Sequence, residues 1–122
     1  MERSPLDGCS ILVVEDEPLI AMNIEFAFER CGADVAVASS VKDASFLVDE
    51  GFSLGILDHG LPDGQGTELY ELFHELGVPF IIYTGHEVPE GVRNGGVVVP
   101  KPARAEYLLT VAEDLVRAHQ LR

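Results

Sequence analysis

Short apolar runs alternate with segments of helical period along the chain, and this alternation occurs five times. The apolar runs lie at residues 10–14, 35–38, 52–57, 78–83 and 97–99. The first run, SILVV, is continuously apolar, which is typical of a strand buried on both faces of a sheet. Strands that alternate with helices are joined by right-handed crossovers. The pattern therefore predicts a doubly wound α/β fold, with helices on both faces of a parallel sheet.

The segments between the runs carry signals for where helices begin and end. Pro18 stands where the first turn of a helix tolerates proline, and Gly32 follows the last apolar residue of that helix. The residues SVKD at 40–43 are typical of a capping box and predict a helix that runs to about residue 50. The apolar stripes of two further helices are formed by Leu69, Leu72, Phe73 and Leu76 and by Leu108, Val111, Ala112 and Leu115.

The stretch between Thr84 and Val97 departs from this rhythm. It contains Pro89 and four glycines, at positions 85, 91, 95 and 96. Glycine and proline are poor helix formers, and the stretch leaves room for little more than one helical turn. The fourth helix is therefore expected to be short, frayed or absent.

Length and composition are those of one compact domain. The chain has 122 residues and a mass of 13.2 kDa. Hydrophobic residues make up 47% of it, which suffices for a single core without a disulfide or a structural metal. Cys9 and Cys31 have neither a metal-binding nor a redox spacing, so we expect two free thiols in a reducing cytosol.

The negative charge of the chain disfavours nucleic acids and acidic membranes as partners. The formal net charge is −13, and the eight Lys and Arg residues are scattered. Binding to nucleic acid or to an acidic membrane surface requires clustered basic residues, so we expect neither. No apolar run approaches the roughly 18 residues of a membrane span, and the start, MERSPLDG, lacks the apolar stretch of a signal peptide. We expect a soluble, cytoplasmic protein.

Polar side chains gather at the predicted carboxyl ends of the strands, where an open parallel sheet binds its ligands. They are Glu15 and Asp16 after the first strand, Asp58 after the third, Thr84 at the end of the fourth and Lys101 after the fifth. Converging carboxylates repel each other unless a cation holds them, and oxygen ligands suit Mg²⁺. With a lysine and a hydroxyl beside them, they form a set suited to phosphoryl transfer onto an aspartate.

Several other charged residues near these ends have simpler interpretations. Neighbours in a strand point to opposite faces, so one of Glu15 and Asp16 is expected to contact the metal directly and the other through water or from farther away. Glu17 is expected to favour the start of the following helix by its charge. The histidines at positions 59, 74 and 119 have no ligand spacing, so we expect them to be solvated or at an interface.

Four segments resemble, in order and spacing, the successive motifs of the receiver domains of bacterial two-component systems. They are ILVVEDEP, LGILDHGLPDGQG, PFIIYTG and PKP, and the resemblance covers about residues 9–120 of the single domain expected over residues 1–122. It implies a flavodoxin-like (βα)5 sandwich with the strand order 2-1-3-4-5. The segment PFIIYTGH is also similar to the P-F-x-x-x-T-G-Y signature of the single-domain alphaproteobacterial receivers called the FAT-GUY class, with His86 in place of the tyrosine.

The resemblance implies a role for each of the residues at the strand ends. Asp58 corresponds to the phosphoacceptor, and Thr84 and Lys101 to the hydroxyl and the lysine that contact the phosphoryl group. Glu15 and Asp16 correspond to the acidic pair at the Mg²⁺ ion. Gly60 corresponds to the position whose backbone carbonyl usually completes the metal shell. The Lys101–Pro102 bond is frequently cis in the family.

The sequence also departs from the family pattern at the switch. Receivers commonly have Tyr or Phe three residues before the lysine, where this chain has Val98. The usual switch, in which a hydroxyl and an aromatic side chain move together, therefore cannot operate in its ordinary form. His86 has two interpretations that stay open at this point: a surface histidine, or a switch and gate beside the phosphoryl group.

The implied function is that of a stand-alone response regulator. It would take a phosphoryl group from a histidine kinase or a histidine phosphotransferase, and would act on a protein partner or as a phosphate shuttle or sink. It would not be an enzyme beyond its own phosphorylation and dephosphorylation. The alternative is a small aspartyl-phosphate phosphatase or phosphotransferase, but such enzymes of the haloacid-dehalogenase type have a second Asp where Gly60 stands. A flavin-binding protein of the same fold is disfavoured because the chain has no Trp and three Tyr.

Overall fold

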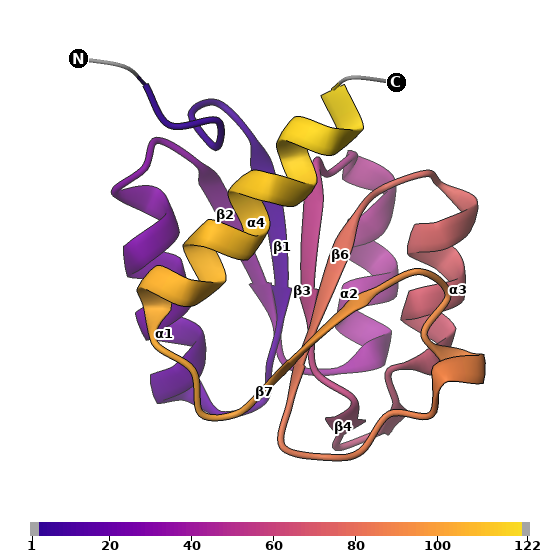
Figure 1. The fold of residues 1–122 in the computed structure, drawn as a ribbon. Helices are drawn as coiled ribbons and strands as arrows, with labels where there is room; N and C mark the ends of the chain where they lie inside the picture. The colour runs from indigo at the N-terminus through magenta and orange to yellow at the C-terminus, as the bar shows by residue number, and fades with distance from the viewer. Residues whose placement is uncertain (1–2, 121–122) are drawn as a thin grey trace.

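The protein is a three-layer α/β sandwich around a parallel sheet of five strands (Figure 1). The computed structural model describes residues 3–120. The sheet has the order β2-β1-β3-β6-β7, in which all neighbours are parallel. Its strands are β1 (Ser10–Val14), β2 (Asp34–Ala38), β3 (Leu54–Leu57), β6 (Phe80–Thr84) and β7 (Val97–Pro100). Counted along these five strands, this is the predicted order 2-1-3-4-5, so the fold class is confirmed.

Helices cover both faces of this sheet (Figure 1). On one face lie α1 (Pro18–Glu29) and α4 (Ala105–Gln120). On the other lie α2 (Val41–Leu47), which continues into the 3-10 helix η1 (Val48–Glu50), and α3 (Thr67–Glu75). The predicted helix boundaries are confirmed. Pro18 begins α1, and Gly32 has a left-handed φ of 90° beyond the end of that helix. At the start of α2, the hydroxyl of Ser40 accepts a hydrogen bond from the N–H of Asp43.

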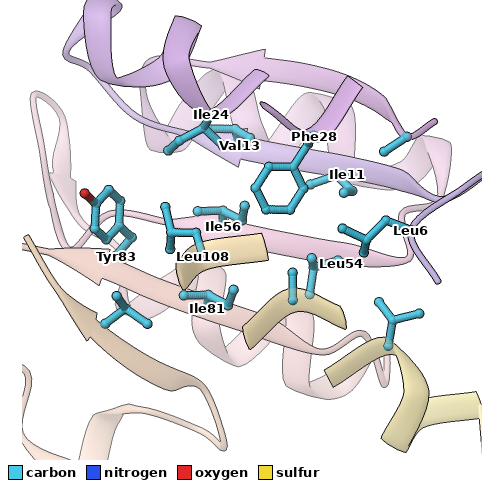
Figure 2. Close-up of a cluster of buried hydrophobic side chains, with 14 residues drawn as sticks. Leu6, Ile11, Val13, Ile24, Phe28, Leu54, Ile56, Ile81, Tyr83 and Leu108 are labelled. Carbon is cyan, nitrogen blue, oxygen red and sulfur yellow. The ribbon is translucent and has the colours of Figure 1, made fainter. Parts of the chain in front are cut away.

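Two hydrophobic cores form because successive side chains of a buried strand point to opposite faces. In β1, Ile11 and Val13 face α1 and α4, whereas Leu12 and Val14 face α2 and α3. Figure 2 shows the first of these cores, in which Leu6 from the segment before β1 also packs. The continuous apolar runs of the sequence thus supply both cores from the same strands.

Two connections differ from a regular succession of strands and helices. Residues 85–96 contain only the 3-10 helix η2 (Glu90–Val92) among their regular elements, so the fourth helix of the pattern is reduced to one short turn, as expected. The loop after β3 contains an antiparallel hairpin of β4 (Gly60–Leu61) and β5 (Gly64–Gln65), which the sequence pattern did not predict. Strands β2 and β7 form the edges of the sheet.

Two expectations from composition can be compared with the described residues. Within residues 3–120, no helix combines the length and the apolar character needed to cross a membrane. Cys9 and Cys31 are half-buried free thiols.

We expect Gly55→Ala to destabilise the fold, because α3 packs directly on this part of β3. A Cβ at Gly55 would lie 2.4 Å from the ring of Phe73, which is fully buried. Overpacking of this kind costs about 1–3 kcal/mol of unfolding free energy, measurable by urea denaturation. Gly91→Ala is the control, because a Cβ there meets no atom within 4 Å. Equal midpoints for the two variants would contradict this account of the packing.

Candidate functional site

The site lies at the carboxyl edge of the sheet, where the parallel register brings the ends of β1, β3, β6 and β7 together. The residues singled out in the sequence leave from these ends: Glu15 and Asp16, Asp58, Thr84 and Lys101. Three of them are almost fully buried, with 3% of Glu15, 4% of Asp58 and 1% of Thr84 exposed. Buried charges require partners, so the contacts among these residues decide what the site can do.

The ammonium of Lys101 joins three of the strand ends. Its Nζ lies 2.8 Å from Glu15 Oε1, 2.9 Å from Asp58 Oδ2 and 3.2 Å from Glu17 Oε2. Glu17 immediately precedes α1, where its charge is expected to favour the helix start, and its carboxylate also contacts Lys101. The peptide bond from Lys101 to Pro102 is cis. One cation therefore bridges the two buried carboxylates and balances only one of their charges.

These contacts shift the ionisation of each partner. Burial opposes the charge of Lys101, but its hydrogen bonds to Glu15 and Asp58 raise the pKa of the ammonium above its ordinary value. Burial also opposes ionisation of Asp58, but hydrogen bonds from Lys101 and Thr84 lower the pKa of its carboxyl. At Glu15 burial prevails and raises the pKa. Asp58 is therefore held as a carboxylate, the form that can act as a nucleophile.

A third carboxylate completes an acidic pocket. One oxygen each from Glu15, Asp16 and Asp58 lies within 4.8 Å of the others, and Asp16 is exposed to solvent. Among the described residues this is the one such group of three acidic, histidine or cysteine side chains. A set of closely spaced carboxylate oxygens, one of them open to solvent, fits a hard divalent cation that keeps some of its water.

The loop of residues 58–66, called here the Asp58 loop, is braced from within. The N–H of His59 donates to Asp58 Oδ1 at 2.7 Å, and the N–H of Gly66 donates to the carbonyl of His59 at 2.8 Å. A Cβ at Gly66 would lie 2.4 Å from the carbonyl oxygen of Asp58, so the loop closes this tightly because the residue is glycine. Local contacts therefore hold the backbone on either side of Asp58 and where the loop meets α3.

His59 corrects an expectation, because it is neither solvated nor placed at an exposed surface. It is 7% exposed, its Nδ1 lies 3.0 Å from the hydroxyl oxygen of Tyr70, and the two rings stack. The Tyr70 hydroxyl in turn donates to the carbonyl of Asp58 at 3.4 Å. Burial raises the pKa of Tyr70, so the hydroxyl stays protonated and able to donate. Tyr70 was not predicted from the sequence, although its place in the first turn of the helix after the loop was a usable signal.

His86 lies across the two loops of the site. Its backbone N–H donates to the hydroxyl of Thr84 at 3.2 Å. Its imidazole packs on Gly60, where a Cβ would lie 2.7 Å from Nε2. The side chain is exposed, so His86 borders the entrance to Asp58 rather than the core. A side chain at Gly60 would therefore require the exposed imidazole to shift.

The segment of residues 85–96 lies over a hollow beside Thr84 and Lys101. The hollow has a volume of about 780 Å³. Val98 lines the hollow but is too small to fill it. The segment is anchored by the buried Val88, whose carbonyl accepts a hydrogen bond from Arg93 Nε at 2.9 Å. The site is therefore closely packed on its β3 side and loosely packed on its β6 side.

Comparisons with known proteins agree with this geometry. The family model for the response regulator receiver domain matches residues 11–112. The chain is 28% identical over 128 residues to the two-component response regulator ARR11 of Arabidopsis thaliana, and 37% identical over 65 residues to the response regulator protein PilR of Pseudomonas aeruginosa. These alignments cover 96% and 52% of this chain but only 25% and 15% of the relatives, so the chain spans a quarter or less of their length.

A solved structure shares the fold over nearly its whole length. It is the crystal structure of a CheY-like response regulator receiver domain protein from Methanospirillum hungatei JF-1, with a TM-score of 0.86 and 26% sequence identity. The superposition covers 93% of this chain and 98% of that one.

Proposed function

Since the chain belongs to the response-regulator receiver-domain family of two-component systems, we propose that Asp58 is its phosphoacceptor and that a histidine kinase or histidine phosphotransferase is the donor. The observation that carries this proposal is the buried Asp58 carboxylate, held 2.9 Å from the Lys101 ammonium inside an acidic pocket. A carboxylate nucleophile, a fixed cation and a hydroxyl are the parts that transfer to an aspartate requires.

The proposed reaction forms one bond and breaks one. A carboxylate oxygen of Asp58 attacks the phosphorus of a phosphohistidine, an O–P bond forms, and the P–N bond breaks with its electron pair going to the imidazole. Lys101 and Thr84 then face the new phosphoryl oxygens, which carry roughly −1.5 to −2 charges. Mg²⁺, held by Asp16, Asp58 and the Gly60 carbonyl with Glu15 nearby, would neutralise part of this charge.

The same geometry disfavours the alternative function of a small-molecule phosphatase or phosphotransferase. The enzymes considered above require a second aspartate where this chain has Gly60, and a side chain there would have to displace the His86 imidazole. We therefore propose that the domain catalyses only its own phosphorylation and dephosphorylation. We also place it in the FAT-GUY class on the segment PFIIYTG, with an output through a protein partner or as a phosphate shuttle or sink.

Acetyl phosphate and Mg²⁺ are expected to add one phosphoryl group to the protein, seen by intact mass and labile to base. Asp58→Asn should abolish the adduct, because an amide is not a nucleophile here, and its circular dichroism should match that of the parent. Glu87→Gln, at an exposed residue of the following loop, is the control and should be phosphorylated like the parent. An undiminished adduct in Asp58→Asn would contradict the assignment.

Mg²⁺ is expected to raise the melting temperature, because a bound cation relieves repulsion among the three carboxylates. Binding at about 100 times the Kd adds about 2.7 kcal/mol to the stability of the folded state. Asp16→Asn should weaken this effect and slow phosphorylation, since it removes the exposed carboxylate of the pocket. The measurement is thermal unfolding over a Mg²⁺ titration, and a parent-like Kd in Asp16→Asn would exclude this residue as a ligand.

The signal is proposed to leave through residues 85–96. The Thr84 hydroxyl, already beside the Asp58 carboxyl, would bond to the phosphoryl group, while Val98 is small and gains little by moving into the hollow. Four glycines make ordering of this segment costly in entropy, so it is the element with most to gain from new contacts. His86, already packed on Gly60, is placed to donate to the phosphoryl oxygens and draw the segment in.

Amide exchange across residues 85–96 is expected to be fast in the resting protein and to slow with phosphorylation or with beryllofluoride. His86→Ala should reduce this slowing without preventing modification of Asp58, whereas the neighbouring Glu87→Ala should preserve it. Hydrogen exchange with mass spectrometry reads both effects. Equal protection of the segment in the two states would mean that the signal leaves through another surface.

A further inference from the structure

We propose that Asp63 is a positioning residue that couples the Asp58 loop to the first turn of α2, so that α2 responds when the site is filled. The inference rests on the proposed function of Asp58 and adds a second responding element to residues 85–96. It starts from two hydrogen bonds that link segments far apart in the sequence. Oδ1 of Asp63 accepts the N–H of Val41 at 2.9 Å, and Oδ2 accepts the N–H of Lys42 at 3.0 Å.

The first turn of α2 depends on these bonds. A helix leaves its first N–H groups without partners inside the helix. In α2 the N–H groups of Val41 and Lys42 go to Asp63, while that of Asp43 goes to the hydroxyl of Ser40 at 3.1 Å. The α-helix has seven residues, VKDASFL, and a helix this short is not stable through its own hydrogen bonds. The Asp58 loop thus supplies two of the three caps.

The dependence also runs from α2 to the loop. Asp63 stands in the turn of the β4–β5 hairpin, whose register pairs Gly60 with Gln65 and Leu61 with Gly64. Its tether to α2 therefore fixes the hairpin that begins at Gly60, two residues from Asp58. The two backbone hydrogen bonds lower the pKa of the Asp63 carboxyl, and its side chain is exposed to solvent, so it is ionised at neutral pH. An ionised carboxylate at a helix start also interacts favourably with the helix dipole.

Such a link acts equally in both directions, because coupling between two sites is reciprocal. A ligand that orders the Asp58 loop strengthens the caps of α2. A well-formed first turn of α2 in turn holds the Gly60 carbonyl in place and so favours the ligand.

Ser40 offers the matched comparison, because it caps the same turn from within its own segment and has no contact with the Asp58 loop in the described hydrogen bonds.

The test compares Asp63→Ala, Asp63→Asn and Ser40→Ala with the parent, with Mg²⁺ alone and with Mg²⁺ and beryllofluoride as probes. In the parent, amide exchange at Val41 and Lys42 should slow when either probe binds. Asp63→Ala should lose this response and bind Mg²⁺ about fivefold more weakly, at the lower end of typical coupling between sites. Asp63→Asn keeps one acceptor oxygen and should fall between Asp63→Ala and the parent. Ser40→Ala should speed exchange at Asp43 but keep the Kd for Mg²⁺.

The outcomes separate the coupling from the proposed function. A parent-like Kd for Mg²⁺ in both Asp63 variants, or equal weakening in Ser40→Ala, would overturn the coupling and leave Asp58 as the phosphoacceptor. A parent that binds neither Mg²⁺ nor beryllofluoride would overturn both proposals. If Asp63→Ala fails to fold, Asp63→Asn decides alone, since its single missing acceptor must still shift the Kd and the exchange of one of the two amides.

Discussion

The contact of one ammonium with two buried carboxylates is the constraint on which the site depends. Glu15 and Asp58 leave different strands, and each would be costly to bury as an unpaired charge. Lys101, between Pro100 and a cis bond to Pro102, brings one cation to both. The paired carboxylates fix the relative position of the ends of β1, β3 and β7. The exposed Asp16 and the Thr84 hydroxyl lie beside this contact.

The sequence predicted the features that depend on local pattern and missed those that depend on distant pairs. Continuous apolar runs predicted the five sheet strands, and the rule that parallel strand ends meet predicted which side chains converge. The β4–β5 hairpin was not predicted, because two strands of two residues each are too short to show an alternation of apolar and polar positions. His59 was expected to be solvated or at an interface. Its burial was missed because it depends on stacking against Tyr70, which lies on a helix eleven residues further along the chain. The caps that Asp63 provides to α2 are equally invisible, because they cross more than twenty residues of sequence.

The site is asymmetric in its mechanical support. On the β3 side, tight glycine packing, the Tyr70 hydroxyl and the Asp63 caps restrain the loop that carries Asp58. On the β6 side, a 3-10 turn and a hollow stand where a full helix would pack. If Asp58 is phosphorylated as proposed, we expect the larger displacement on the loosely packed β6 side. We expect a smaller effect on α2 through the tightly packed β3 side.

The reduced fourth helix also has a consequence for the behaviour of the protein in concentrated solution. Edge strands whose backbone groups remain open can pair with other chains and begin aggregation. Strand β7 is such an edge, and Val97 is 38% exposed. It has only four residues, and it ends in Pro100, which has no N–H to offer to another strand. The short length and the terminal proline thus limit self-association at an edge that lacks a full helix for cover.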